Sequence, residues 1–303
     1  MGRAAWWRKS SLGFAISLLL VLVVKLSCQT RRLNADDILK LPSQPALAKI
    51  SYGSAPQQYA ELRVPEGKGP FPVVIVIHGG CWVQYADTQY TAHLASALLK
   101  EGWATWNLEY RRAHEEGGAW PGTFLDAGEG VDALRASAGK YSLDLNRVVV
   151  MGHSAGGQMA LWIAGRRNIP GDSPLHASNP LRVRGAVSLA GIADMRVYAE
   201  MGLKDCAAGA LRVMGGTAAG QPARYAAASP VELLPLGTPQ VLVWGEEDTI
   251  VPEKLFEEYE TRAKKSGDPV EIIRVPQAGH HELCSAEGPG WPKIVAALHK
   301  LLR

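Results

Sequence analysis

Residues 147–157 read RVVVMGHSAGG, a β-branched run that ends in the pattern G-x-S-x-G. A second apolar run, residues 159–164, has helix-forming composition and follows directly. A strand that turns sharply into a helix lifts the side chain at the turn, here Ser154, above the sheet. Bulk beside such a turn would clash, so glycine is required at Gly152 and Gly156. The stretch therefore predicts an α/β fold with a strained strand-to-helix turn.

Ser154 needs partners, because a serine hydroxyl is a weak nucleophile until an oriented base takes its proton. Two further buried-strand runs, residues 241–245 and 270–275, are each followed by a suitable group. Asp248 follows the first run and His280 follows the second. Open α/β sheets place their sites just beyond the carboxyl ends of the strands. We therefore expect the three side chains to converge.

Two of these positions have neighbours that offer the same chemistry. Glu246 or Glu247 could orient the base while Asp248 caps the following helix. His281 directly follows His280 and is an alternative base.

A further apolar run, residues 72–77, leads into HGGCW at residues 78–82. Acyl transfer passes through an intermediate with a negative oxygen, which backbone N–H groups stabilise where glycines allow a close approach. We assign this oxyanion hole to the amides of Gly80 and Cys81, with Ala155 as the donor that follows the nucleophile.

Other side chains near these motifs have supporting roles. We expect His78 to hold the oxyanion loop by a backbone hydrogen bond, and His153 to be either a packing residue or a residue at the rim of the site. Trp82 has two interpretations, as a substrate-binding wall of the pocket or as an ordinary core residue.

Together the motifs resemble α/β-hydrolase esterases of the His-Gly-Gly-x-Trp branch, from about Ile50 to the C-terminus. That branch includes arylformamidase-like, feruloyl-esterase-like and acetyl-esterase-like enzymes, and it is similar to the catalytic domain of prolyl oligopeptidases. The resemblance implies an α/β-hydrolase fold with a mostly parallel central sheet flanked by helices. It assigns Ser154, Asp248 and His280 to a catalytic triad that cleaves small-molecule carboxylic esters through an acyl-enzyme. It implies no metal and no organic cofactor.

Other functions share parts of this machinery. An arylformamidase-like amide hydrolase or a small peptidase would differ in the leaving group. A non-catalytic ligand-binding protein with the hydrolase fold would commonly lack a triad member, and none is missing here. The 303 residues are 47% hydrophobic and carry a formal net charge of +3. The charges are scattered, which argues against a nucleic-acid partner.

The N-terminus differs from the rest of the chain. Basic residues precede an apolar run over residues 12–24, which is short for a membrane span and typical of a signal-peptide core. We interpret residues 1–28 as a signal peptide or membrane anchor, and the protein as exported: secreted, periplasmic or membrane-anchored. Cleavage near Ser27, lipidation of Cys28, retention of the segment, or a buried helix of the fold remain alternatives.

The remaining residues divide into a linker at 29–48 and a catalytic domain at 49–303, with a small, partly helical cap at 192–231. An exported protein favours disulfides. Because Cys28 lies in the leader and Cys81 in the oxyanion loop, we predict a Cys206–Cys284 bridge that ties the cap to the rim of the site. No cysteine or histidine spacing resembles a zinc site.

The expected elements alternate between strands and helices, which indicates a mostly parallel sheet. Strands are expected at residues 49–52, 59–64, 72–77, 104–108, 147–151, 186–190, 241–245 and 270–275. Helices are expected at residues 91–100, 124–138, 159–164, 251–265 and 291–302.

Overall fold

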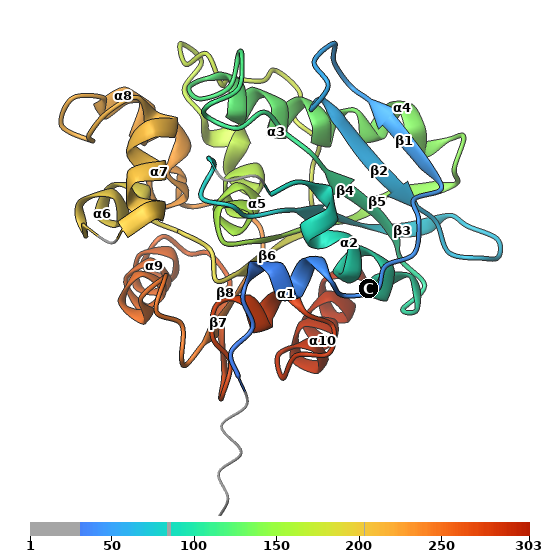
Figure 1. Cartoon of the computed structure of the whole chain (residues 1–303). Coiled ribbons are helices and arrows are strands. Elements are labelled where there is room, and N and C mark those ends of the chain that lie inside the picture. Colours follow the sequence, from blue (N-terminus) through green and yellow to red (C-terminus); the bar gives the residue numbers. More distant parts are fainter. Residues whose placement is uncertain (1–30, 84–85, 203) are drawn as a thin grey trace, which may run out of the picture. The chain divides into compact units, whose positions relative to one another are not determined.

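An eight-stranded sheet is the centre of the computed structural model, which describes residues 31–83, 86–202 and 204–303 (Figure 1). The strands are β1 (Ala48–Ser51), β2 (Tyr59–Arg63), β3 (Phe71–Ile77), β4 (Ala104–Leu108), β5 (Leu143–His153), β6 (Gly185–Leu189), β7 (Gln240–Gly245) and β8 (Val270–Val275). Their order in the sheet is β1-β2-β4-β3-β5-β6-β7-β8. Every strand predicted from the sequence is present.

Strand direction agrees with the α/β prediction. The edge strand β1 pairs antiparallel with β2, and β2 pairs antiparallel with β4. All pairs from β4 to β8 are parallel. The carboxyl ends of β3, β5, β7 and β8 therefore meet at one edge of the sheet, and the loops that follow them carry the predicted site residues.

Ten α-helices and three short 3₁₀ helices lie in the described parts of the chain. The α-helices are α1 (Ala35–Leu39), α2 (Thr88–Leu99), α3 (Gly122–Asp132), α4 (Leu134–Ala138), α5 (Ala155–Gly165), α6 (Met195–Glu200), α7 (Lys204–Met214), α8 (Pro222–Ala228), α9 (Glu253–Lys265) and α10 (Trp291–Leu302). The 3₁₀ helices are η1 (Arg166–Asn168), η2 (Pro230–Leu233) and η3 (His281–Cys284). The single helix expected at 124–138 is two helices, α3 and α4. Within the described residues, no helix combines the length and hydropathy that a bilayer crossing requires.

Side chains of the central strands alternate between two apolar clusters, one on each face of the sheet. Along β3, Val73, Ile75 and Ile77 belong to the cluster that contains α5 and the cap helices. Val74 and Val76 belong to the cluster that contains α2 and α10. A strand that is covered on both faces has an unbroken run of apolar residues, as β3 has at residues 72–77. Figure 1 shows α5 and α10 on opposite sides of the sheet.

The predicted cap region, 192–231, contains α6, α7 and α8, which group together beside α9 (Figure 1). The segment expected to be a linker is more ordered than predicted, because it contains α1. The Asn34 side chain accepts from the Asp37 amide and the Asp37 side chain accepts from the Asn34 amide, which closes a capping box. The Leu33 amide donates to Glu282 Oε1 at 2.8 Å and so joins this segment to the loop that follows β8. The leader predicted at 1–28 lies outside the described residues.

Candidate active site

Ser154 lies in the turn between β5 and α5. Its backbone has φ 55° and ψ −119°, a region that residues other than glycine rarely adopt. Its amide donates to the Leu189 carbonyl of β6 at 2.8 Å, and its carbonyl accepts from the Gln158 amide of α5 at 3.1 Å. The neighbouring strand and the following helix therefore both secure the strained turn that the G-x-S-x-G pattern predicts.

The glycines around this turn are required by close backbone contacts. A Cβ atom on Gly152 would lie 2.1 Å from the Gly156 carbonyl oxygen. A Cβ atom on Gly156 would lie 2.2 Å from the Ile77 carbonyl oxygen at the end of β3. A Cβ atom on Gly79 would lie 3.0 Å from Ser154 Cβ, so the loop after β3 passes directly against the nucleophile.

His280 and Asp248 form a buried pair at the ends of β8 and β7. His280 Nδ1 lies 2.8 Å from Asp248 Oδ2, and the two side chains are 6% and 0% exposed. The other carboxylate oxygen, Oδ1, accepts from the amides of Ile250 and Val251 at 2.7 and 3.0 Å. The carboxylate is thus held in place and aims one oxygen at the imidazole. No hydrogen bond between described residues joins Ser154 Oγ to His280, whose Nε2 is not used by another described side chain.

The competing residues lie in different surroundings. Glu246 and Glu247 are exposed, and Glu247 pairs with Arg32. His281 Nδ1 lies 3.0 Å from the hydroxyl of Tyr90 on α2. Burial, together with the neighbouring histidine, lowers the pKa of His281 to about 4. Geometry therefore favours the acid and base that the family resemblance implies.

The oxyanion loop has an unusual backbone. Gly80, Cys81 and Trp82 have φ values of 101°, 52° and 59°. The Gly80 carbonyl accepts from the Val83 amide at 3.0 Å, which closes the turn. Among the hydrogen bonds between described residues, none uses the amides of Gly80, Cys81 or Ala155 as donors. These three amides are the donors that the sequence proposes for a developing oxyanion.

A buried polar network supports this loop. His78 Nδ1 donates to the Gly79 carbonyl at 2.9 Å, and its Nε2 lies 3.1 Å from Glu109 Oε1. The Tyr110 ring stacks on His78 with centroids 4.3 Å apart, and its hydroxyl donates to the carbonyls of His78 and Gly79. Glu109 also accepts from the amides of Tyr110 and Thr88, each at 3.0 Å. The supporting role predicted for His78 is confirmed, whereas Glu109 is a residue that the sequence reasoning missed.

Trp82 is a core residue and not a wall of an open pocket. It is fully buried, and its indole N–H donates to Gln158 Oε1 at 3.1 Å. The Gln158 amide in turn donates to the Ala228 carbonyl at the end of α8. A buried indole N–H needs a partner, and a glutamine on the elbow helix supplies it. The substrate-binding interpretation of Trp82 is therefore wrong.

The disulfide differs from the one predicted. Cys81 of the oxyanion loop is bonded to Cys206 of α7, with Cα atoms 4.7 Å apart, and Cys284 is a free, buried thiol. Burial raises the pKa of Cys284 to about 12. A Cβ atom on Gly209 would lie 2.3 Å from the Cys81 carbonyl oxygen, so α7 packs directly on the loop. The prediction of a Cys206–Cys284 bridge failed because it excluded Cys81 from pairing; only the backbone donates to an oxyanion, so the side chain is available to link the loop to the cap.

Metal-ligand geometry is absent from the described parts of the chain: no group of three or more His, Cys, Asp or Glu side chains is arranged to hold an ion.

Known proteins that are similar to this chain in sequence include esterases, and the chain also matches a family of α/β-hydrolases. The BD-FAE family model matches residues 62–261. Esterase LipC of Mycobacterium tuberculosis is 26% identical over 238 residues, which cover 77% of this chain and 59% of that protein. Esterase LipQ of the same organism is 24% identical over 211 residues, covering 69% of this chain and 50% of that protein. The chain thus spans only about half to three fifths of the length of these curated relatives.

Solved structures share the fold at low identity. A truncated form of a carbohydrate esterase from gut microbiota superposes with a TM-score of 0.71 at 20% identity, covering 86% of this chain and 96% of that chain. A bacterial heroin esterase superposes with a TM-score of 0.66 at 22% identity, covering 81% of this chain and 80% of that chain. At such identities the likeness establishes the α/β-hydrolase fold.

Proposed function

The chain belongs to the BD-FAE family, and from that premise we propose that it is a serine esterase acting on small-molecule carboxylic esters. The observation that carries the proposal is the 2.8 Å contact between His280 and Asp248, at the same edge of the sheet as the strained turn at Ser154. Relatives named as esterases support this reaction class.

The first half of the proposed reaction forms an acyl-enzyme. His280 Nε2 takes the proton of Ser154 Oγ as that oxygen attacks the ester carbonyl carbon. The Nδ1–H of His280 donates to Asp248, which fixes the tautomer and stabilises the imidazolium that forms. Because two backbone amides hold the other carboxylate oxygen, Asp248 needs no rearrangement during this step.

The carbonyl oxygen becomes negative as the tetrahedral intermediate forms. The amides of Gly80, Cys81 and Ala155 are available to donate to it, and each such donor typically contributes about 10²–10³ in rate. His280 then gives its proton to the departing alcohol. In the second half, His280 activates a water molecule that attacks the acyl group, and the carboxylic acid leaves as Ser154 is restored.

Replacing Ser154 by alanine tests the assignment. We expect kcat on a p-nitrophenyl ester to fall by up to about 10⁶ while the thermal unfolding midpoint stays near that of the wild type. A fluorophosphonate probe should label the wild-type protein at Ser154 and leave Ser154→Ala unlabelled. A variant that kept most of its activity would refute the nucleophile assignment. A wild-type protein that reacted with neither ester nor probe would instead indicate a ligand-binding protein.

The leaving group and acyl chain are tested by a substrate panel. Acetyl, butyryl, long-chain and feruloyl esters should be hydrolysed faster than aryl formamides or dipeptide amides. The panel includes acetylated sugars because one structural neighbour is described as a carbohydrate esterase. Faster cleavage of the formamide or the peptide bond would replace the esterase proposal by one of those activities.

We also propose that the protein acts outside the cytosol. The leader predicted from the sequence at residues 1–28 is the first support, and the Cys81–Cys206 disulfide is the second, because such bonds persist in oxidising compartments. Fusing residues 1–48 to a reporter that is active only after export tests this localisation. A fusion protein that accumulated in the cytosol without reporter activity would contradict it.

A further inference from the structure

The middle residue of the elbow, His153, is hydrogen-bonded on both sides of its ring. It is 1% exposed, and its Nε2 lies 2.9 Å from the backbone carbonyl oxygen of His280. Its Nδ1 lies 3.2 Å from the hydroxyl of Tyr90, which also lies 3.0 Å from His281 Nδ1. Three elements, α2, β5 and η3, thus contribute one side chain each to a series of hydrogen bonds that ends at the backbone carbonyl of the proposed base, His280.

The donor and acceptor of each hydrogen bond in this series follow from the His280 carbonyl oxygen. A carbonyl oxygen only accepts, so His153 Nε2 carries a proton and donates to His280 O. Burial, with His280 and His281 nearby, holds the pKa of His153 well below its usual value, so Nδ1 is an acceptor. Tyr90 therefore donates its single hydroxyl proton to His153, and its oxygen accepts from His281 Nδ1–H.

We propose that His153, Tyr90 and His281 are positioning residues that hold the His280 backbone against the nucleophile elbow. This inference rests on the esterase function proposed above. The His280 side chain is fixed at Nδ1 by Asp248, but that bond alone leaves the loop free to shift as a unit. The bond from His153 fixes the same residue at its carbonyl, and His153 is covalently adjacent to Ser154. The hydrogen bond from His153 therefore fixes the position of the His280 backbone relative to Ser154.

The chemistry of the middle position follows from this role. Its side chain must donate toward His280 and accept from Tyr90 while remaining uncharged, and a neutral imidazole does both. The ring centroids of His153 and His280 lie 4.6 Å apart. A second positive charge at that distance would oppose formation of the catalytic imidazolium. The neutral, hydrogen-bonded ring thus orients the base without that repulsion.

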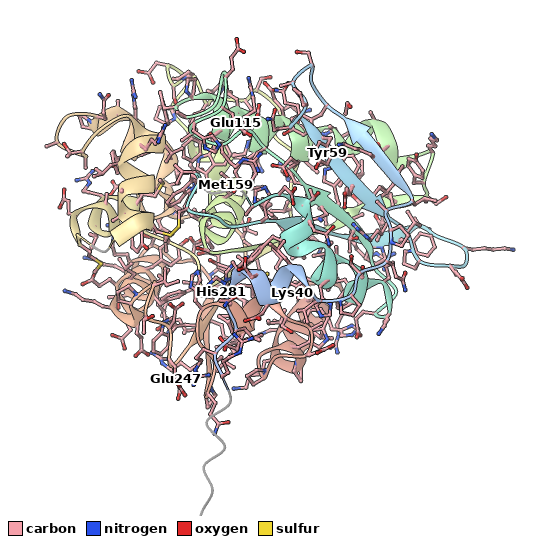
Figure 2. The ribbon with its side chains drawn as sticks, viewed as in Figure 1. Lys40, Tyr59, Glu115, Met159, Glu247 and His281 are labelled. Carbon is pink, nitrogen blue, oxygen red and sulfur yellow. A yellow bond between two sulfur atoms is a disulfide. The ribbon has the colours of Figure 1, made fainter. Side chains whose placement is uncertain are left out.

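Tyr90→Phe is the cleanest perturbation, because it removes one buried oxygen and keeps the ring. We expect kcat to fall about tenfold with KM nearly unchanged, since displacements of about 1 Å at a catalytic group can lower the rate about a hundredfold. Tyr59→Phe is the matched control: that hydroxyl contacts Thr88 at 3.2 Å and lies away from His281 (Figure 2). It should leave kcat unchanged.

A pair of variants at His153 separates positioning from packing. His153→Gln retains an amide donor that can reach the His280 carbonyl, whereas His153→Leu retains only bulk. We expect His153→Leu to lower kcat by about 10² and His153→Gln to recover most of the loss. Rates are to be expressed per active site titrated with the fluorophosphonate probe, so that unfolded protein does not count.

The proton NMR signal of the His280 Nδ1–H that faces Asp248 gives a readout independent of turnover. Tyr90→Phe and His153→Leu should shift or broaden it, and Tyr59→Phe should not. Wild-type kcat and an unmoved signal in Tyr90→Phe and His153→Leu would overturn the proposal. A wild-type protein without ester hydrolysis would overturn the esterase function instead, while the NMR comparison would still decide whether these residues place His280.

Discussion

Replacing Cys206 by alanine removes the disulfide to Cys81, and we expect it to lower both the free energy of unfolding and kcat. The two cysteines are 125 residues apart. The chain-entropy model gives about 5 kcal/mol for a closed loop of that length, and the loss of a native disulfide typically costs about 2–5 kcal/mol. The expected destabilisation is therefore several kcal/mol.

The effect on kcat follows from the position of the bond. Cys81 supplies one proposed oxyanion donor, and loss of a whole donor costs about 10²–10³ in rate. In Cys206→Ala the amide remains and Gly209 still packs on the Cys81 carbonyl, so the donor is loosened and not removed. We expect kcat to fall about tenfold, which is well below the loss of a donor.

Equilibrium urea unfolding without reductant measures the stability change, and turnover of a p-nitrophenyl ester measures kcat. Cys284→Ala is the matched control for loss of a buried sulfur, because this thiol forms no disulfide and its hydrogen bond is a long one, 3.9 Å, to the Tyr90 carbonyl oxygen. It should cost about 1 kcal/mol for the small cavity and leave kcat unchanged. A non-reduced peptide map that joined Cys206 to Cys284, or a Cys206→Ala variant with wild-type stability and kcat, would refute the reasoning.

Three further predictions use the same assays. Asp248→Asn should lower kcat by about 10⁴ through loss of the correct imidazole tautomer, whereas exposed Glu247→Gln should not; equal kcat in both would contradict the acid assignment. Gly156→Ala should fail to fold, because the new Cβ would meet a backbone oxygen at 2.2 Å; a soluble variant with wild-type circular dichroism would contradict this. His281 and His153 have lowered pKa values in the folded state, so the unfolded chain binds more protons between pH 4 and 6.5. The contribution of these histidines to the free energy of unfolding is fully present above about pH 6.5 and decreases as the pH falls. At pH 4 the loss from His281 alone is about 3 kcal/mol. Urea unfolding across this range should show the slope, and His281→Gln should reduce it; equal slopes would contradict the assignment.

Local sequence was sufficient to predict the parts of the site that each depend on one strand and its following loop. The apolar run and the glycines around Ser154 predict the elbow because a Cβ atom on Gly152 would clash with Gly156 four residues later, whereas the clash at Gly156 is with the distant end of β3. The order of Asp248 and His280 after later strands predicts their approach, because parallel strands bring their carboxyl ends to one edge.

The segment before β1 shows where composition misleads. Short polar sequence at residues 29–48 predicts a linker, yet α1 forms and Arg32 and Leu33 bind Glu247 and Glu282. A five-residue helix is too short to be stable alone. Its order depends on partners at the other end of the chain, which no local pattern can reveal.

The sequence by itself determined the strands of the sheet, the elbow and the proposed nucleophile, because these follow from periodicity and from local sterics, while the family resemblance selected Asp248 and His280 from neighbours with the same chemistry. Only the tertiary structure decided that Cys81 pairs with Cys206, that Trp82 is buried, and that His153 bonds the backbone of His280. Each of these depends on the distance between segments that are far apart in the chain. Packing sets such distances, and hydrogen bonds and disulfides form only where packing brings the partners within a few ångströms.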